Sequence, residues 1–504
     1  MKPTVEITEV GKIIDVKGDI INIAGIPNCV YGEVLYLEGG GKSIVIEFNE
    51  KRVVALLLTS GINIKAGDKI VSKSELFKVA VDEKLLGRIV NGQVQPIDGK
   101  GPLEGEDLEY RAVFQDAPPI MSRVPISEPM HTGIKLIDTI TPIGKGQREL
   151  ILGDRQTGKT TIAVDAIINQ KNENMICIYC WVGGSYTSMV KVIETLSEKG
   201  ALDYTIFVAA PASVLSTEQY LAPYTAAAIG EYFVKRDKDV LVIFDNLTKH
   251  AWIYRQISLL LNRFPGREAY PGDIFYMHSQ LMERACRMHP KKGGSMTFLP
   301  IADTLQGDVT GYVQTNLISM TDGQLYTSAA LFNEGFRPAI DIGLSVSRIG
   351  NKVQSSALKD VSAGLRREYA QFRGLQKLTK LRTKISEKIA QKINRGQTLI
   401  ELLIQSANAP ISEMDEILIF YAFNRGILDH LSGEEVFEFE KNILIFMKEY
   451  DARFMLEFGY HRKLTEDAKN KIDKGFLEYF KKQGVKSDER RATNDERRTT
   501  RDEL

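Results

Sequence analysis

This 504-residue chain contains the stretch Gly153-Asp154-Arg155-Gln156-Thr157-Gly158-Lys159-Thr160, which has the pattern G-x-x-x-x-G-K-T. A short apolar run at 149–152 precedes it, and an amphipathic run that opens with Thr161 and ends at Ile168 follows it. A strand, a glycine loop and a helix N-terminus form an anion cradle, because backbone N–H groups approach phosphate oxygens and the helix dipole favours negative charge. The sequence therefore predicts that residues 153–161 bind the phosphates of a nucleotide.

Three side chains carry the chemistry expected of such a loop. Lys159 would reach the β- and γ-phosphates, and the Thr160 hydroxyl would bind Mg²⁺. A second carboxylate usually ends an apolar strand at the same sheet edge, and Asp245 follows the apolar run 240–244. A strand-terminal aspartate can instead cap the next helix, but the loop upstream favours the metal role. We expect ATP or ADP with Mg²⁺ as the ligands.

Efficient hydrolysis needs one more group, usually a carboxylate that positions the attacking water. In this fold the group would come from the end of the strand after the loop helix, which here is the run 175–182. Gly183 and Gly184 follow that run, and no carboxylate appears before Glu194. The sequence therefore favours nucleotide binding without efficient turnover.

Composition argues against several classes of protein. The 65 lysines and arginines balance the 65 aspartates and glutamates, so no global charge would recruit nucleic acid or an anionic membrane. No apolar stretch approaches the ~20 residues that span a bilayer, and the N-terminus has no signal-peptide apolar region. We expect a cytoplasmic chain, or one held at the membrane through partners.

Cys177 and Cys180 have C-x-x-C spacing, but inside a strand-like run they are predicted to be buried thiols.

The residue patterns predict an α/β protein with three domains and a tail. Residues 1–74 carry short β-branched runs with hairpin-sized turns, which indicates a small β-barrel. Residues 75–357 alternate helices with apolar strands, which indicates a parallel sheet. Helical periodicity marks residues 358–485, and the polar tail 486–504 is predicted to be disordered. The predicted strands of the sheet are 150–152, 175–182, 205–209, 240–244, 295–299 and 317–320.

A further candidate is Arg348, which lies close before Gly350 at the expected junction of the sheet and helical domains. It could form a structural salt bridge. It could equally be an arginine finger that acts in trans on the γ-phosphate held by a neighbouring subunit. The residue pattern alone leaves both readings open.

Several motifs together resemble the alpha, non-catalytic subunit of F-type rotary ATP synthases. The resemblance runs from about residue 12 to about residue 428, and Arg155 with Gln156 inside the loop distinguishes alpha from the catalytic beta subunit. Besides the loop, the motifs are Pro96–Pro102, Pro142–Leu150, Tyr254–Leu261 and Pro265–Asp273.

This resemblance implies an N-terminal β-barrel, a RecA-like P-loop domain and a helical base. It implies a regulatory subunit that alternates with a beta-type catalytic partner in a ring around a central gamma-type shaft, held peripherally at the inner face of the membrane through partners. Arg348 matches the alpha residue that reaches the catalytic site of the adjacent beta subunit. Arg337, Pro338 and Gln405 match positions beside the bound adenine.

The chain departs from the family pattern at several positions. Gly184 stands where alpha subunits carry glutamine, and Ala407 replaces a second adenine-facing glutamine, so weaker nucleotide binding is expected. The family's N-terminal helix, which grips the peripheral stalk, is expected to be missing because the predicted barrel begins close to Met1. These departures fit a divergent paralogue of the mycoplasma type, whose head could drive motility or another membrane process.

Two other classes share the core fold. A self-sufficient homohexameric ATPase, such as a secretion-export motor, requires a water-positioning glutamate, and Gly184 counts against it. A nucleic-acid translocase would need a basic surface with aromatic side chains for single strands. Balanced charge disfavours this class, so nucleic acid is not an expected partner.

Overall fold

The computed structural model describes residues 8–50, 52–105, 108–379, 386–429 and 431–483. The chain forms two compact units, one of Met1–Ile126 with Gly144–Ala329 and one of Ser127–Ile143 with Ala330–Leu504. The predicted polar tail lies outside the described residues. In the described ranges, every helix is either too short or too polar to cross a lipid bilayer.

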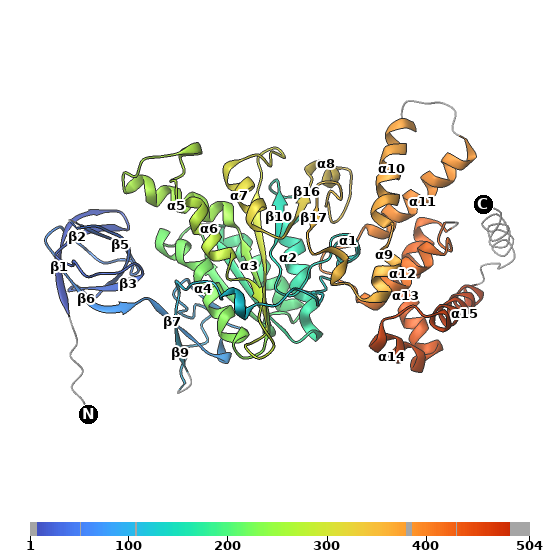
Figure 1. Ribbon diagram of the computed structural model, residues 1–504, viewed down its shortest axis with the longest axis horizontal. Coiled ribbons are helices and arrows are strands. Elements are labelled where there is room, and N and C mark those ends of the chain that lie inside the picture. The colour runs from blue at the N-terminus through green and yellow to red at the C-terminus, as the bar shows by residue number, and fades with distance from the viewer. Residues whose placement is uncertain (1–7, 51, 106–107, 380–385, 430, 484–504) are drawn as a thin grey trace. The chain divides into compact units, whose positions relative to one another are not determined.

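The first unit begins with a closed barrel of six strands, drawn in blue in Figure 1. The hydrogen-bonded order is β1-β2-β5-β4-β3-β6, and alternate residues such as Ile13, Ile23 and Leu35 fill the interior. This confirms the predicted barrel. The strands are β1 (Glu9–Lys17), β2 (Ile20–Ala24), β3 (Glu33–Leu37), β4 (Lys42–Phe48), β5 (Val53–Leu57) and β6 (Lys69–Leu76).

The second part of this unit is a parallel sheet with the order β16-β10-β15-β13-β11-β12-β8. Every residue of β10, β11, β12 and β15 is buried, because helices such as α2 (Lys159–Ile168), α4 (Ser216–Val234) and α5 (Leu247–Leu260) pack on the sheet. This confirms the predicted α/β class (Figure 1). The strands are β8 (Ile89–Val90), β10 (Glu149–Gly153), β11 (Met175–Val182), β12 (Thr205–Ala210), β13 (Asp239–Asp245), β15 (Ser295–Asp303) and β16 (Gly323–Thr327).

Shorter strands and helices complete the first unit. Strand β7 (Lys78–Val81) pairs with β9 (Glu109–Ala112), and β14 (Cys286–Arg287) lies antiparallel to β15. The helices are α2 (Lys159–Ile168), α3 (Tyr186–Glu198), α4 (Ser216–Val234), α5 (Leu247–Leu260), α6 (Ile274–Met282) and α7 (Tyr312–Met320). Cys177 and Cys180 are free and fully buried on β11, as predicted.

One predicted strand is wrong. Residues 317–320 end helix α7, and the strand at this edge is β16, which starts three residues later. Val313, Asn316 and Leu317 are buried with the i, i+3, i+4 spacing of a helix face. A four-residue apolar run alone does not distinguish a buried helix turn from a strand.

The second unit is helical, as predicted for the C-terminal region. Helix α12 forms its centre, since a continuous run from Glu416 to Phe423 is buried. The segment 127–143 contributes α1 to this unit, although it precedes the sheet in the chain. The helices are α1 (Lys135–Ile140), α8 (Ala329–Asn333), α9 (Ser356–Ser362), α10 (Leu365–Thr379), α11 (Glu387–Leu403), α12 (Glu413–Asn424), α13 (Gly433–Tyr450), α14 (Ala452–His461) and α15 (Glu466–Lys482).

A buried ion pair joins the segment 127–143 to α12. His131 Nε2 lies 3.3 Å from Glu413 Oε2, and Arg462 also contacts this carboxylate. Burial favours the neutral form of both groups, but their hydrogen bond and opposite charges outweigh it. The pKa of His131 is therefore raised and the pKa of Glu413 is lowered.

Replacing His131 with glutamine should lower the thermal unfolding temperature most at about pH 5.5, and the deficit should shrink as the pH rises. Because the pKa of His131 is raised on folding, its charged form stabilises the fold fully below the unfolded value of about 6.5. That contribution is lost as the pH rises through the folded value. A hydrogen bond to a charged partner is worth about 1.5–3 kcal/mol. Calorimetry from about pH 5.5 to about pH 9 measures the deficit.

The matched control is His461→Gln, because His461 is exposed on the same unit. Its unfolding temperature should follow that of the unchanged chain at every pH. A deficit for His131→Gln that stays constant over the pH range would contradict the charged pair.

Candidate nucleotide-binding site

The two glycines of the loop are required for different reasons, a close approach at Gly153 and a left-handed backbone conformation at Gly158. β10 ends at Gly153, where a Cβ would collide with the side chain and backbone carbonyl of Thr327. Gly158 takes a left-handed φ of 92° directly before α2, and a Cβ there would enter open space. The loop thus turns from strand to helix with its backbone uncovered, as a phosphate cradle needs.

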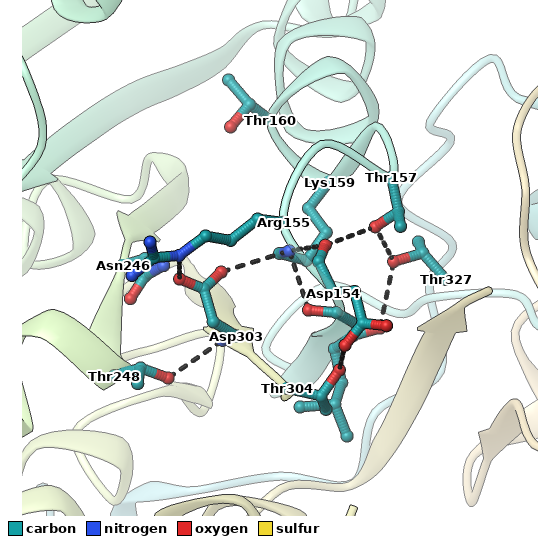
Figure 2. Close-up of polar contacts among 12 residues, drawn as sticks. Asp154, Arg155, Thr157, Lys159, Thr160, Asn246, Thr248, Asp303, Thr304 and Thr327 are labelled. Atoms are coloured by element: carbon teal, nitrogen blue, oxygen red, sulfur yellow. Dashed lines mark hydrogen bonds and ion pairs between the residues drawn. The ribbon is translucent and has the colours of Figure 1, made fainter. Parts of the chain in front are cut away.

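Side chains from the neighbouring strands hold the loop in place (Figure 2). Thr157 Oγ1 donates to Asp154 O at 2.8 Å and lies 2.6 Å from Thr327 Oγ1. Asp154 Oδ1 accepts hydrogen bonds from Thr304 Oγ1 at 2.6 Å and from Gly307 N at 2.9 Å. Asp154 and Thr157 are therefore positioning residues of the loop, while Gln156 is exposed with a φ of 64°.

Lys159 is folded back against the loop that it follows. Its Nζ donates to Gly153 O at 2.8 Å and Asp154 O at 2.5 Å, and lies 3.2 Å from Asp303 Oδ1. Burial lowers the pKa of Lys159, and the Asp303 carboxylate opposes that shift. The ammonium group is thus held at the loop, with donors that can turn to phosphate oxygens.

Thr160 and Asp245 are brought together as predicted. Thr160 Oγ1 donates to Asp245 Oδ2 at 2.8 Å, and Tyr179 donates to the same oxygen at 2.8 Å. Burial raises the pKa of Asp245. A hydroxyl beside a carboxylate is the hard-oxygen donor pair that Mg²⁺ takes alongside phosphate oxygens and water. The residues present therefore fit a nucleotide-bound Mg²⁺.

Asp303, the last residue of β15, also belongs to the site but was not predicted from the sequence. Asp303 Oδ2 lies 3.7 Å from Arg155 Nε, and its backbone N–H donates to Thr248 Oγ1 at 2.9 Å (Figure 2). β15 is the direct neighbour of β10, so its carboxyl end lies beside the loop. An aspartate at the end of an apolar strand, the same signal that located Asp245, could have identified it.

An indole ring occupies the space beside Gly184. A Cβ at Gly184 would lie 2.6 Å from Trp181 Nε1 and closer still to ring carbon Cζ2. Trp181 is only 5% exposed and ends the buried part of β11 together with Val182. The position expected to carry a water-positioning side chain is therefore filled by the ring of a residue three positions earlier.

The three predicted adenine-site residues lie together in the second unit. Arg337 and Pro338 line a small, mainly apolar pocket with Leu136, Tyr369 and Ile400. The Arg337 guanidinium donates to Phe332 O at 2.6 Å and Phe336 O at 2.8 Å.

Gln405 is next to this pocket and forms hydrogen bonds with backbone groups around it. Its N–H donates to Arg337 O at 2.7 Å, and its side-chain amide donates to Gly133 O at 2.7 Å and Ala409 O at 2.9 Å. Its Oε1 accepts from Lys135 N at 3.0 Å. Gln405 therefore positions the chain around Arg337.

Arg348 follows the two-residue strand β17 (Val346–Ser347) and is exposed. Among the residues that the structure describes, none forms an ion pair or a side-chain hydrogen bond with it. The backbone before it is held, because Ser347 Oγ donates to Pro142 O at 2.8 Å. These contacts do not support the structural salt bridge, and they leave the guanidinium accessible.

Comparison with protein families gives two matches. The nucleotide-binding domain of the ATP synthase alpha/beta family matches residues 133–347, and the C-terminal domain of ATP synthase alpha/beta chains matches residues 354–479. Together the matches cover roughly two-thirds of the chain and include the loop and Asp245, whereas Arg348 lies in the short gap between the two matched ranges. A nucleotide-binding domain of this family binds ATP or ADP within a hexameric complex. The chain therefore belongs to the ATP synthase alpha/beta family, as a nucleotide-binding subunit of a rotary ATPase.

Proposed function

We propose that this chain is the regulatory, alpha-type subunit of the rotary ATPase, which binds Mg-ATP without turning it over efficiently. One observation carries the proposal: the phosphate cradle and the Thr160–Asp245 pair are complete, whereas the Trp181 ring fills the space for a water-positioning side chain at Gly184. The proposed site therefore has the groups that bind a nucleotide but lacks the side chain that would position water for its hydrolysis.

In this proposal the loop N–H groups and Lys159 bind the phosphates, and Lys159 exchanges its contacts with loop carbonyls for phosphate oxygens. Thr160 and Asp245 would hold Mg²⁺, which neutralises phosphate charge when bound. No carboxylate at position 184 can accept a proton from water, and an indole N–H is a donor only. The nucleotide is therefore held rather than hydrolysed.

Arg348 serves a neighbouring subunit in the proposed ring. An exposed guanidinium without an ion pair in the described part of the chain can reach another subunit's γ-phosphate at little cost in lost contacts. The partner that receives it is a beta-type catalytic subunit in an alternating heterohexamer around a gamma-type shaft. We place this head in the cytoplasm, peripheral to the inner face of the cell membrane through its partners.

The purified chain should bind Mg-ATP and hydrolyse almost none, whereas its complex with the beta-type partner should be an active ATPase. Isothermal titration measures binding, and phosphate release measures turnover over the same range of concentrations. Robust turnover by the pure chain would overturn the non-catalytic assignment. Absence of nucleotide binding would overturn the regulatory site itself.

A further inference from the structure

The Asp303 carboxylate contacts both cationic side chains of the loop (Figure 2). Its Oδ1 lies 3.2 Å from Lys159 Nζ, and its Oδ2 lies 3.7 Å from Arg155 Nε. Among the residues that the structure describes, these two cations are the ion-pair partners of Asp303. A negative charge that belongs to the chain therefore occupies the cations that would otherwise attract the negative charge of a phosphate.

All three donors of the Lys159 ammonium group already have partners. Gly153 O and Asp154 O accept two of them, and Asp303 Oδ1 lies within reach of the third. A phosphate oxygen that displaces Asp303 breaks this ion pair. A phosphate oxygen that displaces a loop carbonyl instead comes to lie beside the carboxylate, so that two negative charges share one ammonium group. In both cases Asp303 opposes phosphate binding.

The fold fixes this charge at the end of the phosphate loop. In the register of the sheet, Asp303 lies opposite Gly153, the first residue of the loop. Its backbone is held on both sides, because its N–H donates to Thr248 Oγ1 at 2.9 Å and its carbonyl accepts from Gln314 Nε2 at 2.6 Å. Asp303 is only 8% exposed, so water screens its charge less than it would at the surface.

We propose that Asp303 is an autoinhibitory residue of the nucleotide site, whose carboxylate competes with the terminal phosphates for Lys159 and Arg155. This inference rests on the proposed nucleotide-binding function and identifies a residue that lowers the affinity for the nucleotide. A carboxylate that instead held water around Mg²⁺ would raise that affinity. The two roles therefore predict opposite effects of removing the charge, and the contacts with two cations favour competition.

Replacing Asp303 with asparagine removes the charge and keeps the size of the side chain. The variant should bind a nucleoside triphosphate with an imido β,γ bridge about tenfold more tightly or better in the presence of Mg²⁺. The gain should persist in EDTA without added Mg²⁺, because Asp303 competes for cations of the chain. It should be smaller for ADP, which lacks the γ-phosphate that Lys159 also contacts. Isothermal titration measures each affinity.

Three further variants make the test specific to the charge at this position. Asp303→Glu keeps the charge and should show none of the gain. Asp303→Ser removes the charge, should show the gain, and decides the question if Asp303→Asn does not fold. The matched control is Asp322→Asn, because Asp322 pairs with Arg148 at 2.9 Å directly before strands β16 and β10, at the end opposite the loop. Its affinity should equal that of the unchanged chain.

The results that would contradict the inference differ from those that would contradict the proposed function. If the unchanged chain binds the imido triphosphate and Asp303→Asn binds it equally or more weakly, the inference is overturned and the proposed function stands. A loss of affinity that appears only with Mg²⁺ would assign Asp303 to the water shell of the metal. If neither the unchanged chain nor the Asp303 variants bind the probe, the proposed function fails, and the inference fails with it.

Discussion

Replacing Arg348 with alanine should reduce ATP hydrolysis by the assembled complex by on the order of 10³-fold or more. An arginine finger stabilises charge that develops on the transferred phosphoryl group, and its planar guanidinium can donate two parallel hydrogen bonds to phosphate oxygens. Arg348 makes no ion pair within the described residues, so its removal should spare folding and assembly. Steady-state phosphate release by the purified complex, with its mass confirmed by light scattering, measures both effects.

Two further variants sharpen this test. Arg348→Lys keeps the charge but loses the fork of donors, so most of the defect should remain. Arg367→Ala removes an equally exposed arginine from α10 and should leave hydrolysis near normal. A complex that keeps near-normal activity with Arg348→Ala would show that the finger assignment is wrong.

Replacing Lys159 with alanine should nearly abolish Mg-ATP binding by the isolated chain. Truncating one partner of a buried, hydrogen-bonded charge pair costs about 2–5 kcal/mol, which is roughly 30-fold to several thousand-fold in affinity. Lys159 is buried at the loop with its Nζ 2.8 Å from Gly153 O, so water cannot easily replace it at a phosphate. Isothermal titration with Mg-ATP gives the affinity.

The matched control is Lys145→Ala. Lys145 Nζ forms an ion pair with Asp239 Oδ2 at 2.8 Å at the start of β13, whereas Asp245 ends that strand at the nucleotide edge. Its loss should therefore leave nucleotide affinity unchanged. Equal affinities for Lys159→Ala and Lys145→Ala would show that the loop does not bind the phosphates.

The loop and the proximity of Thr160 to Asp245 could be predicted because their signals are local. A G-x-x-x-x-G-K-T stretch between a strand and a helix, and an aspartate after a buried strand, each depend on a few adjacent residues. The closed barrel, the parallel sheet and the helical region followed from periodicity in the same way. The structure brings Thr160 and Asp245 within hydrogen-bond distance, as their sequence positions predict.

The missed features depend on contacts between distant parts of the chain. Asp303 ends an apolar strand as Asp245 does, but its position beside Lys159 depends on the pairing of β15 with β10, which no local pattern specifies. The segment 127–143 joins the second unit through pairs such as His131 with Glu413, which lie far apart in sequence. The error at 317–320 has a different cause, since a short apolar run fits a helix turn as well as a strand.

The overlap between the Trp181 ring and any side chain at Gly184 has an evolutionary consequence. A single substitution that installs a carboxylate at position 184 meets the indole, and a single substitution that removes the indole installs no carboxylate. In the proposed alpha-type subunit, gaining a water-positioning carboxylate at position 184 would therefore require two changes. In the proposed ring, this steric incompatibility between near neighbours would preserve the difference between the subunit that binds nucleotide and the subunit that hydrolyses it.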